Sequence, residues 1–197
     1  MIQYLCRICI FLVISSTVII ATETGRTILN DVGITPKIKT QIDGNLEFTD
    51  HQGNTIPLQR FHTQNKPTIL SLVYYSCPIL CNMLTEGLIN GLNDLNKPIG
   101  DQFNLVSVSF NENDTTSQAT AFKTKHTQSL PNTLTPENWT FLTGTKKSIQ
   151  SLTQQVGFGF KYLERQGEFA HPSTLIVLTP EGKISRYLYG VTFSKFD

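Results

Sequence analysis

Residues 68–81 read Thr-Ile-Leu-Ser-Leu-Val-Tyr-Tyr-Ser-Cys-Pro-Ile-Leu-Cys, and the rest of the sequence is arranged around them. Residues 69–75 form a nearly continuous run of apolar and strand-forming side chains, which is typical of a strand buried on both faces. After this run, Pro78 fits the first position of a helix and Cys77 fits its N-cap. Leucines at helical spacing support a helix over residues 78–93: Leu80, Leu84, Leu88, Leu92 and Leu95. The sequence therefore predicts a buried strand that delivers two cysteines to the N-terminus of a helix.

The chemistry of these cysteines follows from their spacing. Cys77 and Cys81 are four residues apart, so on a helix they share one face with Cα atoms roughly 6 Å apart, which a disulfide can bridge. The free N–H groups and the positive end of the helix dipole favour thiolate over thiol. A disulfide closing so short a loop adds little stability, so we interpret the pair as functional. Such a dithiol can cycle with a disulfide or hold a soft metal, and the spacing leaves both open.

Length and composition narrow the class of protein. A chain of 197 residues suits one domain and a leader. A formal net charge of +1, with 16% charged residues, gives no electrostatic footprint for nucleic acid, so we expect no nucleic-acid partner. Two other cysteines, Cys6 and Cys9, lie in the first twenty residues, so Cys77 and Cys81 are the thiols of any processed protein.

The N-terminus has the features of an export signal. Within residues 1–22, Arg7 precedes an apolar stretch over residues 8–21, which predicts a secretory signal peptide with an uncleaved membrane anchor as the alternative. In either case the domain works outside the reducing cytosol, where a disulfide persists. We expect a periplasmic or an outward-facing, membrane-anchored protein, or one of the mitochondrial intermembrane space in a eukaryote.

The remaining sequence predicts an extended lead-in over residues 23–44 and a single domain over residues 45–197. A hairpin over residues 45–58 has Pro57 in its second arm, which confines that arm to a sheet edge. Further strands are predicted over residues 103–110, 139–142, 158–163, 173–179 and 184–189, and helices over residues 116–128 and 146–156. Strands that alternate with helices indicate an α/β fold, a thioredoxin-like mixed sheet with helices on both faces.

Residues 72–81 resemble the Cys-x-x-x-Cys signature of the SCO/SenC family of periplasmic and mitochondrial copper proteins. The resemblance continues through residues 106–110, 141–144, 167–171 and 178–187, and it covers roughly residues 33–194. Because these separated blocks occur in the family's order, the match is more specific than a single Cys-x-x-x-Cys motif.

The resemblance implies a thioredoxin-like fold that binds one copper ion through Cys77, Cys81 and His171. It also implies a metallochaperone, or a thiol-disulfide reductant, for the dinuclear copper site of cytochrome c oxidase. The expected partners are the copper-site subunit of the oxidase and a copper donor or thiol reductant, with membrane association through the N-terminus. Two thiolates suit Cu(I), and an added imidazole accommodates Cu(II) as well.

The sequence departs from the family in three places. Where members carry Asp-Pro and a further acid, residues 111–114 read Asn-Glu-Asn-Asp. His171 is followed by Pro172, which stiffens the ligand loop. The sequence ends at Asp197, where similar members continue into a closing C-terminal helix, so the predicted fold lacks that helix.

Another class of function remains open, a metal-free thiol-disulfide oxidoreductase or thiol peroxidase. In that case Cys77 would attack the substrate and Cys81 would resolve the mixed disulfide. The three-residue spacing and His171 favour copper, and a redox or copper sensor on the same scaffold is a third reading.

The other polar candidates are given structural roles. His51, His62 and His126 are predicted to be solvated surface residues. Asp114 is predicted to cap the helix that follows it.

Overall fold

The computed structural model describes residues 31–62, 65–95, 102–131, 134–194 and 197. The predicted signal peptide or anchor, residues 1–22, lies outside these ranges. Among the described residues, no helix combines the length and the apolar character needed to cross a membrane.

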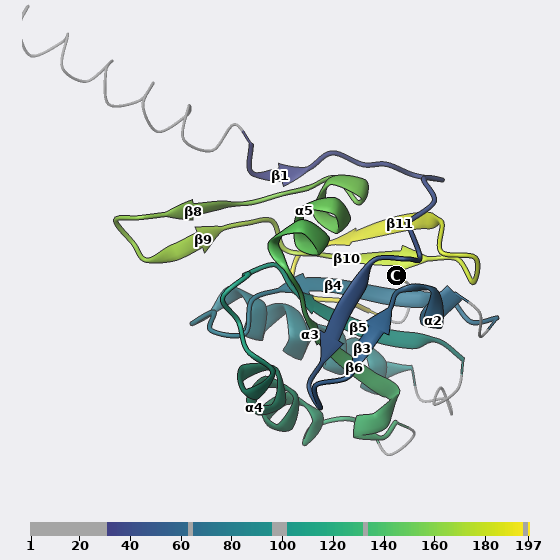
Figure 1. Ribbon diagram of the computed structural model, residues 1–197. Coiled ribbons are helices and arrows are strands. Elements are labelled where there is room, and N and C mark those ends of the chain that lie inside the picture. Colours follow the sequence, from purple (N-terminus) through teal and green to yellow (C-terminus); the bar gives the residue numbers. More distant parts are fainter. Residues whose placement is uncertain (1–30, 63–64, 96–101, 132–133, 195–196) are drawn as a thin grey trace, which may run out of the picture.

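A seven-stranded mixed sheet forms the centre of the molecule (Figure 1). Its strand order is β11-β10-β4-β5-β6-β2-β3, in which β4, β5 and β6 run parallel and the other neighbouring pairs are antiparallel. The strands are β2 (Glu47–Asp50), β3 (Thr55–Pro57), β4 (Thr68–Val73), β5 (Asn104–Ser109), β6 (Trp139–Thr143), β10 (Thr174–Leu178) and β11 (Ile184–Tyr189). The predicted edge position of the strand that contains Pro57 is confirmed, because β3 ends the sheet.

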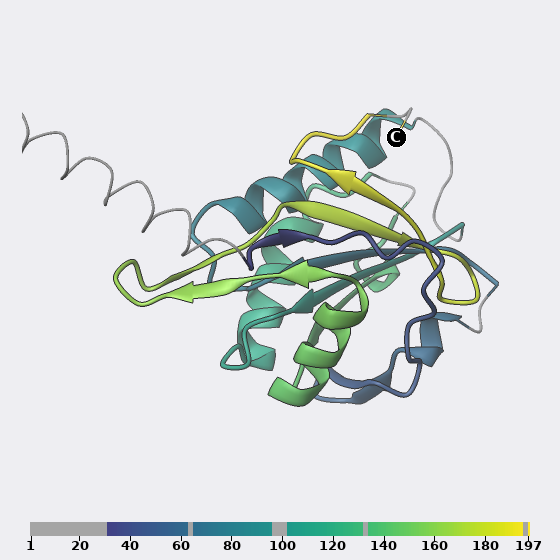
Figure 2. The ribbon, with the colours of Figure 1, turned by 90° about the horizontal axis from the view of Figure 1, so that it is seen from above.

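Helices cover both faces of this sheet. The long helix α3 (Leu80–Asp94) links β4 to β5, and α4 (Thr116–Thr127) links β5 to β6. Both cross between neighbouring parallel strands in the same direction, so right-handed crossovers place them on one face. Figure 2 shows α5 (Lys146–Gln155) on the opposite side of the sheet from α3. The prediction of a thioredoxin-like mixed sheet with helices on both faces is therefore confirmed.

The remaining elements of the described chain are short. Four short strands form two small antiparallel sheets: β1 (Gly33–Ile34) pairs with β7 (Phe158–Gly159), and β8 (Lys161–Leu163) pairs with β9 (Glu168–Ala170). The others are α2 (Gln59–His62) and the 3-10 turn η1 (Pro136–Asn138). The pairing of β1 with β7 fastens the lead-in segment to the rest of the domain. The single strand predicted over residues 158–163 is wrong, because β7 and β8 belong to two different sheets.

The central strands β4 and β5 are buried, and most of their side chains are apolar on both faces. Residues 70–73 of β4 and 105–109 of β5 are all buried, as expected for strands covered by helices above and below. Two serines in these runs, Ser71 and Ser107, face each other with their Oγ atoms 2.6 Å apart, and the Trp139 indole N–H donates to Ser107 Oγ. These buried polar groups therefore have hydrogen-bond partners within the core.

The C-terminal segment lies along α3 (Figure 2). A Cβ atom at Gly87 would lie 2.0 Å from the Val191 carbonyl oxygen, and one at Gly91 would lie 3.1 Å from the Phe193 carbonyl oxygen. Among residues 190–194 and 197, which the structure describes after β11, no helix is present. The two glycines therefore let the chain after β11 approach the helix backbone directly.

Gly87→Ala is expected to destabilise the domain by about 2 kcal/mol, although alanine favours an exposed helix by about 1 kcal/mol over glycine. The sign changes because the added methyl meets the rigid backbone at Val191. Urea unfolding of the variant measures the loss, with Asn90→Ala on the exposed side of α3 as the control. A stability equal to or above that of the wild type would show that the segment is not packed on α3.

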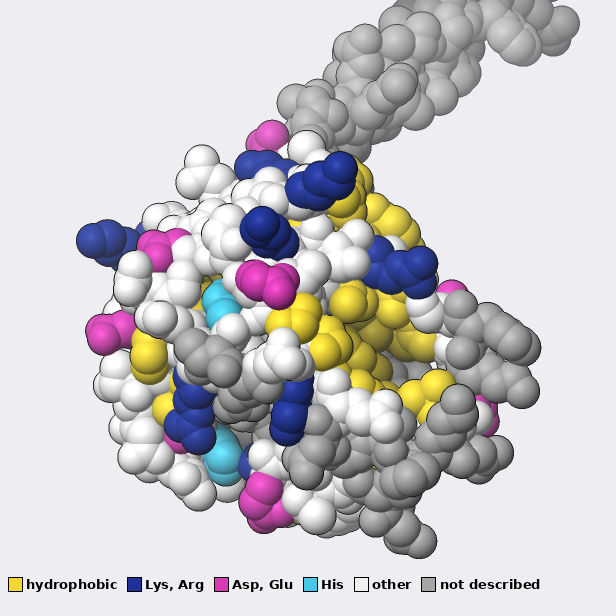
Figure 3. Space-filling model, turned by 90° about the vertical axis from the view of Figure 1, so that its right-hand side faces the viewer, with side chains coloured by type: hydrophobic (Ala, Val, Ile, Leu, Met, Phe, Trp, Pro, Cys, Tyr) yellow, Lys and Arg dark blue, Asp and Glu magenta, His cyan; other side chains and the backbone are white. Residues whose placement is uncertain are grey.

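The side of the molecule that faces right in Figure 1 has a mixed surface (Figure 3). Acidic and basic side chains are interspersed over it, and hydrophobic side chains gather around a hollow. This mixture agrees with the balance of the whole sequence, in which 16 Lys and Arg residues and 15 Asp and Glu residues give a net charge of +1.

Candidate metal centre

Three elements bring the predicted ligands together. Cys77 follows β4, Cys81 lies in the first turn of α3, and His171 lies between β9 and β10. One ligand atom from each residue lies within 4.8 Å of the other two. Within the described residues, this is the one group of at least three His, Cys, Asp or Glu side chains arranged to hold a metal ion.

The centre is closed off from most of the solvent. Cys81 is fully buried, the relative exposure of Cys77 is 7%, and His171 is partly exposed. Both cysteines are free thiols in the structure. The site therefore combines two buried sulfur atoms with an imidazole that solvent, or a partner, can approach.

The helix that carries Cys81 begins later than predicted. It begins at Leu80, with Ile79 as its N-cap, so the predictions of Pro78 as the first helical residue and Cys77 as the cap are wrong. The Cys77 amide instead donates to the Tyr74 carbonyl (3.1 Å), which closes a turn after β4. The Cys77 sulfur accepts the Cys81 amide (3.3 Å), so it still receives a free N–H of the helix N-terminus.

The His171 ring is oriented by its own backbone neighbourhood. Its Nδ1 atom lies 3.0 Å from the Pro172 carbonyl oxygen, and its Nε2 atom lies 3.7 Å from Cys81 Sγ. Because a carbonyl only accepts, Nδ1 carries a proton, and in the neutral imidazole this leaves the lone pair at Nε2. This is the arrangement in which a second hydrogen bond fixes the tautomer of a metal-ligating histidine. The Pro172 peptide bond is trans, since the described residues contain no cis peptide bond.

Aromatic rings form a wall around the imidazole. The rings of Tyr74 and Phe110 lie 5.7 Å and 5.1 Å from the His171 ring, and Phe158 stacks beside it at 6.3 Å. The Tyr74 amide also donates to Cys81 Sγ (3.4 Å). The wall restricts the ring to one position and lowers the local dielectric, which strengthens electrostatic interactions in the site.

Electrostatics makes the two thiols unequal. A hydrogen bond from the Cys81 side chain holds the pKa of the Cys77 thiol far below its ordinary value, although burial acts against it. Burial raises the pKa of the Cys81 thiol well above its ordinary value, and its hydrogen bond to Cys77 acts in the same direction. The metal-free pair therefore holds one negative charge at Cys77 and one proton at Cys81.

Asp114 anchors the turn that precedes Cys77. Its carboxylate accepts the Tyr75 amide (2.6 Å), the Ser109 hydroxyl (2.7 Å), the Asn111 side-chain amide (2.9 Å) and the Ser76 hydroxyl (3.4 Å). The prediction of Asp114 as a helix cap is wrong, because Thr115 caps α4 through a capping box with Gln118. Asp114 is buried, and through Tyr75 and Ser109 it connects the turn after β4 to the end of β5.

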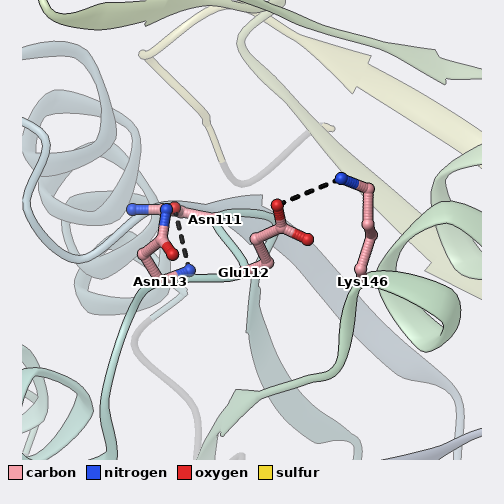
Figure 4. Close-up of polar contacts among 4 residues, drawn as sticks. All are labelled: Asn111, Glu112, Asn113 and Lys146. Atoms are coloured by element: carbon pink, nitrogen blue, oxygen red, sulfur yellow. Dashed lines mark hydrogen bonds and ion pairs between the residues drawn. The ribbon is translucent and has the colours of Figure 1, made fainter.

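The loop that departs from the family pattern borders a cleft beside the site. Asn113 donates its amide to Asn111 Oδ1 (3.1 Å), and Glu112 extends to Lys146 at the start of α5, with 3.2 Å between Oε1 and Nζ (Figure 4). The cleft has a volume of about 560 Å³, and its lining includes Tyr74 and Phe110, which also contact His171. Of the loop's two acidic side chains, Glu112 is thus paired at the surface.

Two residues near the centre were not identified from the sequence. Asn82 donates its side-chain amide to the Cys77 carbonyl (2.9 Å), and its Oδ1 atom lies 3.0 Å from His126 Nε2. The prediction of His126 as a surface residue is wrong, since its relative exposure is 3%. Its position next to Cys81, in the first turn of the helix, could have marked Asn82 as a candidate. No local sequence pattern predicts the contact of Asn82 with a histidine on another helix. His51 and His62 are partly exposed and lie outside the metal-ligand group.

His126 predicts an acid sensitivity of the fold. Burial lowers its pKa to about 4, with the Lys125 charge acting in the same direction. Between this value and the ordinary value of 6.5, the unfolded chain binds the proton that the folded chain excludes. His126 is therefore expected to contribute about 3 kcal/mol above pH 6.5 that is lost as the pH falls to 4.

Urea unfolding between pH 7 and pH 4 measures this loss in the wild type and in His126→Gln. The wild type is expected to lose about 3 kcal/mol more than the variant, whose glutamine keeps a donor but does not titrate. Equal pH dependence in the two proteins would contradict a buried neutral histidine.

Comparisons with known proteins extend this picture. A family model described as SCO1/SenC matches residues 35–194. A solved structure of a protein from Aquifex aeolicus VF5 is similar with 25% identity and a TM-score of 0.70, over 81% of this chain and 89% of that chain. The ScoI of Arabidopsis thaliana, solved with copper bound, has 18% identity and a TM-score of 0.59, over 75% and 87%.

A further similar structure is that of BsSco, a member of the Sco family of cytochrome c oxidase assembly proteins in which a disulfide switch was identified. It shares 18% identity and a TM-score of 0.61, over 80% of this chain and 88% of that chain. Comparison with curated proteins gave no match. The family model covers most of the chain, including all three residues of the metal-ligand group, and this chain belongs to the SCO1/SenC family.

Proposed function

We propose that this protein binds copper through Cys77, Cys81 and His171 and carries it as cargo in the assembly of the copper centre of cytochrome c oxidase. The observation that carries the proposal is the meeting of two sulfur atoms and one histidine nitrogen within 4.8 Å. The Arabidopsis ScoI with copper bound and the assembly family of BsSco support it.

The donor set fits copper in both of its oxidation states. Two thiolates are soft donors that suit Cu(I), and the Nε2 atom of His171 adds the nitrogen donor that Cu(II) prefers. Nε2 is free to bind, because the proton of the ring is held at Nδ1 by the Pro172 carbonyl. The low pKa of Cys77 supplies one thiolate before metal arrives, so binding must release the Cys81 proton only.

The same sulfur atoms make copper binding depend on redox state. Oxidation of Cys77 and Cys81 to a disulfide forms one S–S bond and passes two electrons to an oxidant, and any remaining thiol proton is released. The disulfide has no thiolate left to bind copper. A thiol reductant must therefore act on the oxidised protein before copper is loaded, and we propose such a reductant as a partner.

The remaining partners and the place of action follow from this role. We propose a copper donor and the copper-site subunit of cytochrome c oxidase as partners. We propose that the domain faces the periplasm or an equivalent compartment, held or delivered by residues 1–22.

A second candidate function has one observation in its favour. The Cys77 sulfur accepts the Cys81 amide (3.3 Å) and keeps a small exposed fraction, which suits an attacking cysteine, whereas the fully buried Cys81 suits a resolving one. The lowered pKa of the Cys77 thiol and the raised pKa of the Cys81 thiol act in the same direction. In this case the protein is a metal-free thiol-disulfide oxidoreductase or thiol peroxidase, and His171 has no ligand role.

The test is copper stoichiometry after anaerobic loading with Cu(I) and then Cu(II). The chain should carry Cys6→Ser and Cys9→Ser, so that the leader thiols do not bind metal. One tightly held copper, lost in Cys77→Ser and Cys81→Ser, is expected. No bound copper, together with rapid reduction of a disulfide substrate, would support the second candidate instead.

A further inference from the structure

The side chain of Asn82 has its orientation decided by two residues of α4. Lys125 Nζ lies 2.8 Å from Asn82 Oδ1, and His126 Nε2 lies 3.0 Å from the same atom. A lysine ammonium only donates, so the Asn82 atom that faces it must be the carbonyl oxygen. The amide NH₂ group is thereby turned toward the cysteine loop, where it donates to the carbonyls of Cys77 (2.9 Å) and Pro78 (3.4 Å).

This hydrogen bond replaces one that a regular helix would make. In an α-helix the Cys81 amide would donate to the carbonyl four residues earlier, which is that of Cys77. Here Asn82 takes this carbonyl, and the Cys81 amide donates to the Cys77 sulfur at 3.3 Å. This change of hydrogen-bond partners goes together with the start of α3 at Leu80 instead of Pro78.

We propose that Asn82 is a positioning residue for the dithiol, held in place from α4 by His126 and Lys125. By occupying the Cys77 carbonyl, Asn82 keeps the loop out of helical geometry and keeps the Cys81 amide on the Cys77 sulfur. Asn82 touches neither sulfur, so it acts through the backbone. The part of the proposal that concerns copper rests on the proposed function, and the part that concerns the thiols does not.

Two consequences follow from the loss of the Asn82 amide. The Cys81 amide is free to turn to the Cys77 carbonyl, and the Cys77 sulfur then loses the donor that stabilises its reduced form. The equilibrium of the metal-free protein should shift toward the disulfide on the order of fivefold. Affinity for Cu(II) should fall on the order of tenfold, as for the loss of other groups that orient metal ligands.

Asn82→Ala tests the proposal, with Asn90→Ala as the matched control because it makes the same change on an exposed part of the same helix. Equilibration of the metal-free protein with reduced and oxidised dithiothreitol measures the disulfide, and chelator competition measures Cu(II) affinity. Both should change in Asn82→Ala and not in Asn90→Ala. Asn82→Ala is also expected to unfold at lower urea than Asn90→Ala, because the buried His126 Nε2 loses its acceptor, so both equilibria are measured without denaturant, where each variant is folded. His126→Leu should reproduce part of the disulfide shift, because the amide is then held by Lys125 alone.

The outcomes separate the two ideas. If Asn82→Ala behaves as Asn90→Ala in the dithiothreitol equilibrium, the positioning role is overturned, whatever the copper result. If the wild type binds no copper but Asn82→Ala shifts the disulfide equilibrium, the positioning role stands and the proposed copper function fails.

Discussion

His171→Ala is expected to lower the affinity for Cu(II) by more than about 100-fold while the two cysteines continue to form their disulfide. The loss should exceed that of an orienting group, because the change removes a proposed ligand atom itself. Cu(I) should remain bound, since both sulfur atoms lie within the same ligand group and suit that ion. Chelator competition at each oxidation state measures the two affinities separately.

His62→Ala is the control for this experiment. His62 is a partly exposed histidine outside the metal-ligand group, so its removal should leave both affinities unchanged. Unchanged Cu(II) binding in His171→Ala would mean that the third ligand is misassigned. A parallel loss of Cu(I) would mean instead that the substitution disturbs the cysteines through the aromatic wall of Tyr74 and Phe110.

The part of the candidate site that lies within one short stretch of sequence could be predicted from that stretch. The spacing of Cys77 and Cys81 at a strand-to-helix junction identifies both cysteines as candidates. His171 is 90 residues from Cys81, and only the family resemblance identifies it. The structure brings all three together. No periodicity or motif could place Asn82 against His126, because their contact depends on how α3 and α4 lie side by side on the sheet.

The fold was predictable for a related reason. Strands such as β4 and β5, which are rich in Leu, Ile and Val with only small polar residues between them, are typical of burial on both faces. This signal lies within each strand and does not depend on the rest of the chain. Errors came where a side-chain hydrogen bond decided the local structure. The late start of α3 at Leu80 goes with the hydrogen bond of Asn82 to Cys77, and the role of Asp114 depends on Tyr75, which is 39 residues away.

Asp114→Ala is expected to destabilise the domain by about 4 kcal/mol. The substitution leaves the buried amide of Tyr75 without an acceptor and leaves the buried hydroxyl of Ser109 with only the Asn111 carbonyl at 3.5 Å. Each unsatisfied buried donor costs about 1–3 kcal/mol, and the loss of the charged acceptor adds to it. The turn before Cys77 also loses its link to β5. Urea unfolding followed by the fluorescence of Trp139, the one tryptophan of the chain, measures the change.

Two variants show whether the hydrogen bonds or the loss of a charge cause this effect. Asp94→Ala removes an exposed carboxylate at the end of α3 and should change stability by less than about 0.5 kcal/mol. Asp114→Asn keeps one acceptor oxygen and should recover part of the loss, because Tyr75 and Ser109 both donate to the same oxygen, Oδ2. The recovery is partial because an NH₂ group then takes the place of Oδ1, the acceptor of Asn111 and Ser76. If Asp114→Ala were as stable as Asp94→Ala, the turn would not depend on the carboxylate. In that case the position of the cysteines would depend on α3 and on its contact with α4, a contact that Asn82 makes through His126.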